Sequence, residues 1–185
     1  MEHSLTVWLT GLSGAGKSTL AAELKRQLAD AGTRCFVLDG DVVRAGINRD
    51  LGYGPQDRRE NIRRVAEVAR LMNDAGLLVV AAFISPYRAD RRMAAQIIGR
   101  ERFIEAYLDA PLDVCERRDP KGLYRRARAG EIGEFTGVSA PYETPEAPGI
   151  VLHTAQSGVA ECARRLLELL QARLAPRGRS RSEST

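Results

Sequence analysis

Short apolar runs alternate with longer amphipathic segments along almost the whole chain. The apolar runs predict strands at residues 5–10, 35–38, 77–84, 103–108 and 150–153. Between them, apolar residues that recur every three or four positions predict helices at 17–31, 57–76, 89–98, 112–118, 123–129 and 159–174. Strands and helices that alternate in this way are joined by right-handed crossovers. The pattern therefore predicts an α/β fold in which helices flank both faces of a parallel sheet.

The sequence between the periodic segments adds detail to this fold. Residues 77–84 are almost wholly apolar, which is typical of a central strand buried on both faces. Asp57 and Glu60 resemble a capping box at the start of a helix, and residues 44–59 look irregular. Residues 119–148 are rich in Gly, Pro and charge, and a segment of that length in a compact domain is usually a lid or a binding segment.

The length of 185 residues suits a single domain, which we place at residues 1–175, with a lid at about 119–148. The polar, basic stretch 176–185 is expected to be a disordered tail. No apolar run reaches the roughly 18 residues of a membrane span, and the polar start is too short for a signal peptide. The three cysteines form no CxxC pattern and there are only two histidines, so we expect a cytoplasmic protein without a thiol or histidine metal site.

The strongest chemical signal follows the first predicted strand. Residues 11–18 read Gly-Leu-Ser-Gly-Ala-Gly-Lys-Ser, a complete match to the phosphate-binding loop G-x-x-x-x-G-K-[ST]. Its glycines let backbone N–H groups face anionic oxygens, and the helix that follows adds the positive end of its dipole. Lys17 can reach the β- and γ-phosphates, and the Ser18 hydroxyl can bind Mg²⁺. The residues expected to bind a nucleoside triphosphate are Gly11, Leu12, Ser13, Gly14, Ala15, Gly16, Lys17, Ser18 and Thr19.

Phosphoryl transfer also needs a carboxylate near the metal ion. The long apolar strand ends in Ser85 rather than in an acid, so the candidates are Asp39 and Asp41 after the preceding strand. Gly40 between them permits a sharp turn that directs both carboxylates into one crevice. One of them can hold metal-bound water, and Asp41 can take the proton of an acceptor hydroxyl. A plain Asp-Gly-Asp turn is the alternative interpretation.

Charge is distributed unevenly along the chain. The net charge is only +4, and 25 of the 28 cationic residues are arginines. Residues 44–64 carry +3, residues 117–128 carry +5 and residues 177–185 carry +2, which leaves −6 for the remainder. Both internal windows follow predicted strands, so we interpret them as electrostatics for polyanionic nucleotides, with a cationic lid over the transferred phosphate. Solvated surface and codon bias are the alternatives.

Two further pairs of residues point to a second ligand. Arg58 and Asn61 lie three positions apart near a predicted helix start, which suits an anionic ligand. Tyr53 and Phe135 lie in Gly-flanked loops, where an aromatic ring can stack on a nucleobase for about 1–3 kcal/mol. Local packing is the alternative for both rings. Since no basic stripe interleaves with stacking aromatics, nucleic acid is not expected as a partner.

These motifs together resemble adenylylsulfate kinase (APS kinase) over about residues 5–175. The segments that carry the resemblance are 11–19, 39–44, 57–64, 82–88, 109–112, 118–124, 127–132 and 135–137. Within them, Ile-Ser-Pro-Tyr-Arg and Lys-Gly-Leu-Tyr are far more specific than the widely shared phosphate loop. The resemblance implies that the γ-phosphoryl group of ATP is transferred to the 3′-hydroxyl of adenosine 5′-phosphosulfate (APS), which gives PAPS and ADP.

Carried over by position, the resemblance gives roles to individual residues. It places Asp41 at the acceptor hydroxyl and the metal, and adds Lys17 and Lys121 to the catalytic set. Ser85 matches the serine recorded in the family as a phosphoserine intermediate, although in-line transfer needs no covalent relay and hydrogen bonding at the strand end is its alternative role. The acceptor is then bound by Asp41, Arg44, Tyr53, Arg58, Asn61, Ile84, Ser85, Lys121 and Phe135.

The chain departs from the family's pattern at three positions. Tyr53, which would hold the adenine together with Phe135, stands where the family usually has Phe, and tyrosine can still stack. Val42 replaces the usual Asn and thereby loses an amide hydrogen bond, and Ala45 replaces a frequent His. The resemblance also implies a homodimer and a functional coupling to ATP sulfurylase.

Two other functions are compatible with a phosphate loop. Another small-molecule kinase of this fold, acting on a sugar acid or a shikimate-like acceptor, would need no paired aromatics. A nucleotide-binding regulatory module of the GTPase type would need the guanine-reading motif Asn-Lys-x-Asp, which this sequence lacks.

Overall fold

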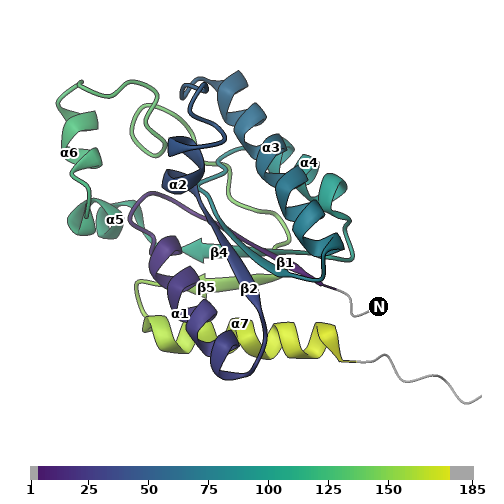
Figure 1. Cartoon of the computed structure of the whole chain (residues 1–185). Helices are drawn as coiled ribbons and strands as arrows, with labels where there is room; N and C mark the ends of the chain where they lie inside the picture. Colours follow the sequence, from purple (N-terminus) through teal and green to yellow (C-terminus); the bar gives the residue numbers. More distant parts are fainter. Residues whose placement is uncertain (1–3, 176–185) are drawn as a thin grey trace, which may run out of the picture.

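Five parallel strands form one sheet in the order β2-β3-β1-β4-β5 in the computed structural model, which describes residues 4–175 (Figure 1). The strands are β1 (Thr6–Thr10), β2 (Cys35–Asp39), β3 (Leu78–Ala82), β4 (Phe103–Asp109) and β5 (Ile150–His153). Thr6 of β1 lies opposite Val79 of β3 on one side and Phe103 of β4 on the other. All five predicted strands are confirmed, and β3 is buried along its whole length as its apolar sequence predicts.

Helices cover both faces of this sheet, as the alternation of segments predicts. They are α1 (Lys17–Asp30), α2 (Gly40–Ala45), α3 (Pro55–Asp74), α4 (Arg88–Ile98), α5 (Leu112–Arg118), α6 (Leu123–Arg128) and α7 (Val159–Leu174). Figure 1 shows α1 and α7 on one face and α3 and α4 on the other. The polar tail at 176–185 lies outside the described residues.

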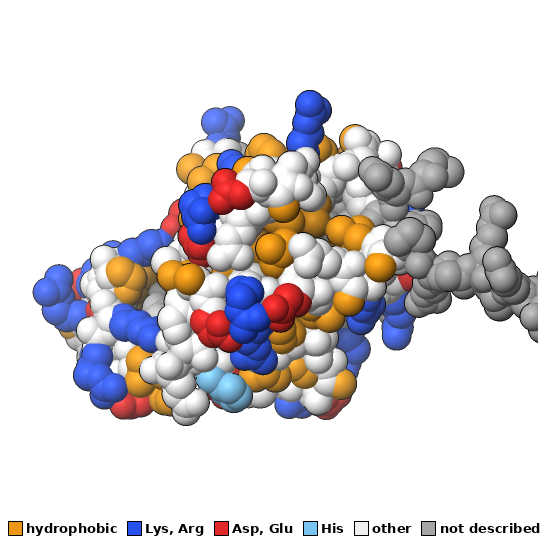
Figure 2. Space-filling model, turned by 90° about the horizontal axis from the view of Figure 1, so that it is seen from below, with side chains coloured by type: hydrophobic (Ala, Val, Ile, Leu, Met, Phe, Trp, Pro, Cys, Tyr) orange, Lys and Arg blue, Asp and Glu red, His pale blue; other side chains and the backbone are white. Residues whose placement is uncertain are grey.

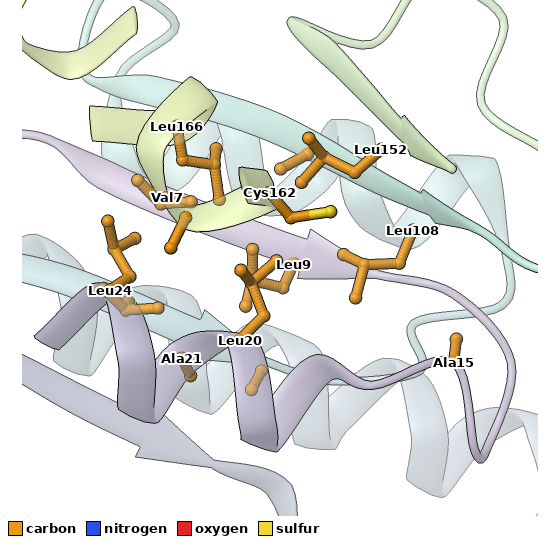
Figure 3. Packing of buried hydrophobic residues seen from close by; sticks show 14 of the residues in the cluster. Val7, Leu9, Ala15, Leu20, Ala21, Leu24, Leu108, Leu152, Cys162 and Leu166 are labelled. Carbon is orange, nitrogen blue, oxygen red and sulfur yellow. The ribbon is translucent and has the colours of Figure 1, made fainter. Parts of the chain in front are cut away.

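The side chains of β1 divide the apolar core into two layers, because successive residues of a strand point to opposite faces. Val7 and Leu9 pack with residues of α1 and α7, such as Leu20 and Leu166, as Figure 3 shows. Trp8 points the other way and packs with residues of α3 and α4. All three β1 side chains are fully buried. Helices therefore pack against both faces of the sheet, and this packing fixes the position of its carboxyl edge.

The segment after β2 differs from the predicted turn. It forms the short helix α2, which Asp39 caps by accepting a hydrogen bond from the backbone N of Asp41 at 2.9 Å. Val43 anchors this helix in the core. Six residues that include a glycine carry too little periodicity for a helix prediction, whereas a side-chain cap and one buried contact suffice to form a turn and a half.

The start of α3 also differs from the prediction. The helix begins at Pro55, which suits a first helical position because its missing N–H would have no intrahelical partner. The predicted capping box at Asp57 and Glu60 is wrong: the Asp57 carboxylate accepts from the backbone N of Gly52 at 3.0 Å, and Glu60 pairs with arginines of its own helix. Residues 55–59 are therefore helical rather than irregular.

The segment 119–148 contains α6 and an isolated β-bridge between Thr136 and Ala140, and otherwise consists of turns, bends and irregular chain. It contacts the carboxyl edge of the sheet at several points. The hydroxyls of Tyr142 and Thr10 lie 2.9 Å apart, and the backbone N of Glu143 donates to the carbonyl of Pro86 at 2.8 Å. Tyr124 donates to the carbonyl of Ser13 in the phosphate loop at 2.9 Å. The segment thus lies over the edge where the predicted motifs end.

Ion pairs are common on the outer surface. On the face in Figure 2, cationic and acidic side chains lie side by side between apolar ones. On α7, for example, Arg164 contacts both Glu161 and Glu168. All three cysteines are free. No helix of the described part of the chain is long and apolar enough to cross a membrane.

Candidate active site

A cavity of about 910 Å³ opens at the carboxyl edge of the sheet, where parallel α/β folds bind their ligands. The cavity brings together the phosphate loop, the segments after β2 and β3, the start of α3, the segment 119–148 and the turn after β5. Of the predicted site residues, those that line it are Ser13, Gly14, Ala15, Gly16, Lys17, Ser18, Thr19, Asp39, Asp41, Arg44, Tyr53, Arg58, Asn61, Ile84, Ser85, Lys121 and Phe135. Gly11 and Leu12 are not among the lining residues.

The phosphate loop needs its glycines for two physical reasons. Gly14 and Gly16 have φ of 74° and 98°, in the left-handed region that L side chains rarely adopt. A Cβ on Gly14 would also lie 2.8 Å from the carbonyl oxygen of Cys115, which is too close. The loop therefore curls tightly over α5 before it enters α1.

Lys17 is held inside this loop by Gly11 and Leu12, the two loop residues that do not line the cavity. Its Nζ donates to the carbonyls of Gly11 at 2.8 Å and Leu12 at 2.7 Å. Burial lowers the pKa of Lys17 to about 8, because desolvation disfavours the ammonium form. A phosphate next to this amine would oppose that effect, since an anion stabilises the charged form.

Oxygen ligands gather beside Lys17. The Ser18 hydroxyl donates to Oδ2 of Asp39 at 2.7 Å, so these two predicted metal-binding groups are in direct contact. The carboxylate of Asp41, at the start of α2, forms an ion pair with Lys121. Hydroxyl and carboxylate oxygens are the donors that Mg²⁺ prefers, so the residues present fit this ion.

Arg44 and Tyr53 form one side of the predicted acceptor site. The guanidinium carbon of Arg44 lies 4.3 Å from the centre of the Tyr53 ring, within the range of a cation–π contact. Arg44 also donates to the carbonyl of Gly52 at 2.8 Å, which holds the loop that carries the ring. Tyr53 as a residue is 62% exposed, which leaves its side chain accessible for stacking.

Arg58 connects this loop to the one that carries Phe135. Its Nε donates to the carbonyl of Tyr53 at 2.7 Å, and its two terminal nitrogens donate to the carbonyl of Glu134 at 2.8 Å and to the hydroxyl of Thr136 at 3.2 Å. Burial lowers the pKa of Arg58 from its usual value. Two of its five N–H groups remain for a ligand. A single guanidinium therefore sets the spacing of the two predicted stacking rings.

The two rings differ in their surroundings. Phe135 is only 8% exposed, and its ring meets that of Tyr124 edge to face at a centroid distance of 5.0 Å. The residue before it, Glu134, has a φ of 50°, a strained value for a residue with a side chain. Phe135 is therefore part of the core of the segment 119–148, whereas Tyr53 belongs to the surface.

Ser85 lies at the floor of the acceptor side and is 3% exposed. Its hydroxyl accepts a hydrogen bond from Nε1 of Trp8 at 3.1 Å and donates to the carbonyl of Phe83 at 3.3 Å. Its φ of 39° lies in the left-handed region, and Arg91 donates to its carbonyl at 2.7 Å. This geometry fits the hydrogen-bonding role at the strand end better than a covalent relay.

Only part of each basic window faces the cavity. Arg44 and Arg58 of the first window and Arg118, Lys121 and Arg126 of the second line it, together with Lys17. Each of these cations already has a protein partner; Arg118, for example, donates to the carbonyls of Gly14 and Thr154. The arginines of the two windows that do not line the cavity but pair with neighbouring acids are Arg63, Arg64, Arg117 and Arg128.

Some lining residues escaped prediction. The turn after β5 contributes Thr154, Ser157 and Gly158, and α7 contributes Val159 and Cys162. Their residue types carry no signal, and the only available indication was their position after a predicted strand. Of the three departures from the family's pattern, only Tyr53 lines the cavity; Val42 is 72% exposed and neither it nor Ala45 is a lining residue.

Comparison with known proteins gives a consistent picture. The family model for adenylylsulphate kinase matches residues 3–153. The adenylyl-sulfate kinase of Bacteroides thetaiotaomicron is 52% identical over 169 residues, which are 91% of this chain and 84% of the relative. The bifunctional enzyme NodQ of Rhizobium tropici is 56% identical over 94% of this chain and 27% of its own length. The structure of the Mycobacterium tuberculosis APS kinase CysC in complex with AMPPNP and APS aligns with a TM-score of 0.89 at 44% identity, over 92% of this chain and 99% of that one.

Proposed function

The chain belongs to the adenylylsulfate kinase family, and from this premise we infer that it is an ATP-dependent kinase that phosphorylates the 3′-hydroxyl of APS. The observation that carries this function is the continuity of one cavity, which joins a complete phosphate loop to a second site with two arginines and two aromatic rings. An acceptor that combines an adenine with a phosphosulfate would use both the aromatic rings and the cations of that second site. The alternative acceptors, a sugar acid or a shikimate-like compound, would leave the rings without a partner.

We propose that the phosphate loop and Lys17 hold the triphosphate of ATP. Ser18 would hold Mg²⁺, with Asp39 and Asp41 binding it through water. This proposal rests on the contact between Ser18 and Asp39 and on an all-oxygen donor set. When bound, Mg²⁺ would supply positive charge that neutralises the charge developing on the transferred phosphoryl group.

On the acceptor side, Tyr53 and Phe135 hold the adenine, and Arg44, Arg58 and Asn61 bind the phosphosulfate. Asp41 takes the proton of the 3′-hydroxyl as that oxygen attacks the γ-phosphorus. The bond from the γ-phosphorus to the oxygen of the β-phosphate breaks in the same step, and ADP leaves. For this the carboxylate must leave its ion pair with Lys121, which is then free to meet the transferred phosphate. Ile84 and Ser85 form the floor against which the ribose is oriented.

The segment 119–148 acts as the lid in this proposal. It carries Lys121 and Arg126 to the cavity, where they would cover the phosphates of the nucleotide. Closing such a segment excludes water, which strengthens every electrostatic interaction with the transferred group. The same closure prevents transfer of the phosphoryl group to water.

Assembly and location complete the proposal. We propose a homodimer that works in the cytoplasm and is coupled to ATP sulfurylase. Three free cysteines support a reducing compartment. The bifunctional name and greater length of NodQ support a link between this domain and a second activity.

One experiment tests the activity directly. The purified protein is incubated with ATP and Mg²⁺ and a panel of acceptors that includes APS, a sugar acid and shikimate, and products are separated by anion-exchange chromatography. Among these acceptors, we expect only APS to be phosphorylated, which gives PAPS and ADP. We expect no turnover in Lys17→Ala or Asp41→Ala. ADP release that does not depend on APS, with no PAPS formed, would refute the proposed function.

A further inference from the structure

A buried pair of asparagines lies behind the acceptor side of the cavity. Asn48 is fully buried between α2 and α3, and Asn61 on α3 is 5% exposed. The backbone of Asn48 is fixed on both sides, because its N donates to the carbonyl of Val43 and its carbonyl accepts from the N of Leu51. Its side-chain Nδ2 donates to Oδ1 of Asn61 at 2.9 Å.

The orientation of these two amides follows from a third atom. Nδ2 of Asn48 also lies 3.5 Å from the backbone carbonyl oxygen of Asn61, with the geometry of a weak hydrogen bond. A carbonyl oxygen can only accept, so the Asn48 atom that faces it must be the donor nitrogen. The Asn61 atom that faces this nitrogen must then be the oxygen. Both amides are thus assigned without reference to a ligand.

The other end of the Asn61 amide is available to the cavity. Asn61 is a lining residue, and within residues 4–175 its Nδ2 has no hydrogen-bond partner. This nitrogen also retains contact with solvent, because it is not among the enclosed polar atoms that lack a partner. Its two N–H groups lie on the same wall of the cavity as Arg58, one helical turn away.

Packing alone does not explain an asparagine at position 48. Its Oδ1 is enclosed and has no hydrogen-bond partner among the described residues. Leu38, Val43 and Val65 are among its neighbours around a small adjoining cavity. A buried acceptor without a partner destabilises the fold, so an apolar side chain of similar size would suit this site at least as well.

We propose that Asn48 is a positioning residue for the acceptor site. By donating to Oδ1 of Asn61 it fixes that amide so that only N–H groups, and no lone pairs, point at the ligand. An anionic oxygen of the phosphosulfate then meets donors, whereas a rotated amide would present an oxygen that repels it. This inference rests on the proposed function, because it assigns the orientation of a residue in the APS site.

The direct test is Asn48→Leu, assayed for the KM of APS, the KM of ATP and kcat, together with urea unfolding. Without the donor, binding an anion at Asn61 leaves Oδ1 buried against a leucine, so we expect the KM of APS to rise roughly 5- to 100-fold. We expect the KM of ATP to stay within about twofold and the stability to be retained. Asn73→Leu is the matched control, since Asn73 is also buried but bonds to Thr6, Leu5 and Leu77 at the opposite edge of the sheet. That variant should lower stability without raising the KM of APS.

Two further variants separate a positioning role from a general packing role. Asn61→Ala should raise the KM of APS by itself, and adding Asn48→Leu to it should raise the KM no further, because Asn48 acts through Asn61. Asn61→Asp always presents an oxygen to the ligand, so it should raise the KM of APS more than Asn61→Ala does. This comparison does not depend on the folding of any Asn48 variant.

An unchanged KM of APS in Asn48→Leu, additive effects in the double variant, or wild-type affinity in Asn61→Asp would each overturn the inference. The wild-type assay distinguishes this failure from failure of the proposed function. If the wild-type protein forms PAPS and the variants behave as in any of these three outcomes, only the role of Asn48 is wrong. If the wild-type protein forms no PAPS, both proposals are wrong.

Discussion

Binding of ATP should take up a proton at Lys17 under mildly alkaline conditions. In the ligand-free protein, burial lowers the pKa of this amine from 10.5 to about 8, so near neutral pH it is largely charged and above pH 8 it is largely neutral. A triphosphate beside the amine stabilises the ammonium form and raises its pKa again. The nucleotide therefore binds together with a proton wherever the free protein has lost it.

The size of the effect follows from the shift. At pH 8.5 about 0.8 of the Lys17 side chains are neutral in the free protein, so binding should take up about 0.8 proton. Over the range from pH 8 upward, the Kd for ATP should rise by up to about tenfold per pH unit. In the absence of nucleotide, the unfolded chain keeps this proton up to about pH 10.5 whereas the folded protein loses it near pH 8. The free energy of unfolding should accordingly rise with pH across that window.

Isothermal titration calorimetry measures this uptake. ATP is titrated at pH 8.5 in two buffers of different ionisation enthalpy, and the difference in the apparent binding enthalpy gives the number of protons. The same titration at pH 7 should show almost no uptake at Lys17, because the amine is already charged. Lys25→Arg, at an exposed position of α1, is a matched control that should leave the uptake unchanged. Lys17→Arg should abolish it, since arginine keeps its charge throughout this range.

Equal apparent enthalpies in both buffers at pH 8.5 would refute the reasoning, and so would the same proton uptake in Lys17→Arg. The first result would mean that Lys17 is charged before the nucleotide arrives. The second would mean that another group takes up the proton.

Four further predictions concern the acceptor side and the frame that supports it. Tyr53→Ala should raise the KM of APS roughly 5- to 150-fold, from the loss of about 1–3 kcal/mol of stacking, and leave the melting temperature unchanged because the residue is exposed. Phe135→Ala should also lower the free energy of unfolding by about 3–5 kcal/mol, measured in urea, and equal stability of the two variants would contradict the assignment of Phe135 to the core. Asp39→Ala should destabilise the protein by about 0.5–2 kcal/mol through loss of the α2 cap. It should also raise the Mg²⁺ concentration needed for half-maximal activity. An unchanged Mg²⁺ dependence would show that Asp39 does not belong to the metal site. Arg91→Met should lower the unfolding free energy by about 3–5 kcal/mol, because it leaves a carboxylate and two carbonyls without their buried partner, and a melting temperature equal to that of the wild type would show that this network contributes nothing.

The strand and helix pattern could be predicted from the sequence because it depends on local periodicity. The phosphate loop could be predicted for a similar reason, since residues 11–18 are contiguous and their glycines and lysine act together. The short helix α2 could not, because its stability comes from the Asp39 cap and from Val43 in the core. Both depend on contacts that exist only after the chain folds.

The candidate site shows the same limit. Charge windows located the cations, but the sequence could not tell that Arg44 and Arg58 face the cavity while Arg64 pairs with Asp50 and Glu60. It also could not tell that Phe135 is enclosed while Tyr53 is exposed. Such distinctions depend on helix rotation and loop packing, and these are set by residues distant in sequence.

Every lysine and arginine that lines the cavity already contacts other groups of the protein. Lys17 and Arg44 donate to backbone carbonyls, and Lys121 and Arg126 pair with carboxylates. Arg58 and Arg118 donate to backbone carbonyls of other segments that line the cavity. An anionic ligand can therefore bind these cations only by replacing contacts that they already make with the protein. A simple monoanion can replace only one of these contacts at a time, whereas a nucleotide with several linked anionic groups replaces many in one event. Selectivity for such ligands over the abundant small anions of a cell can thus arise from the number of exchanges that a single molecule completes.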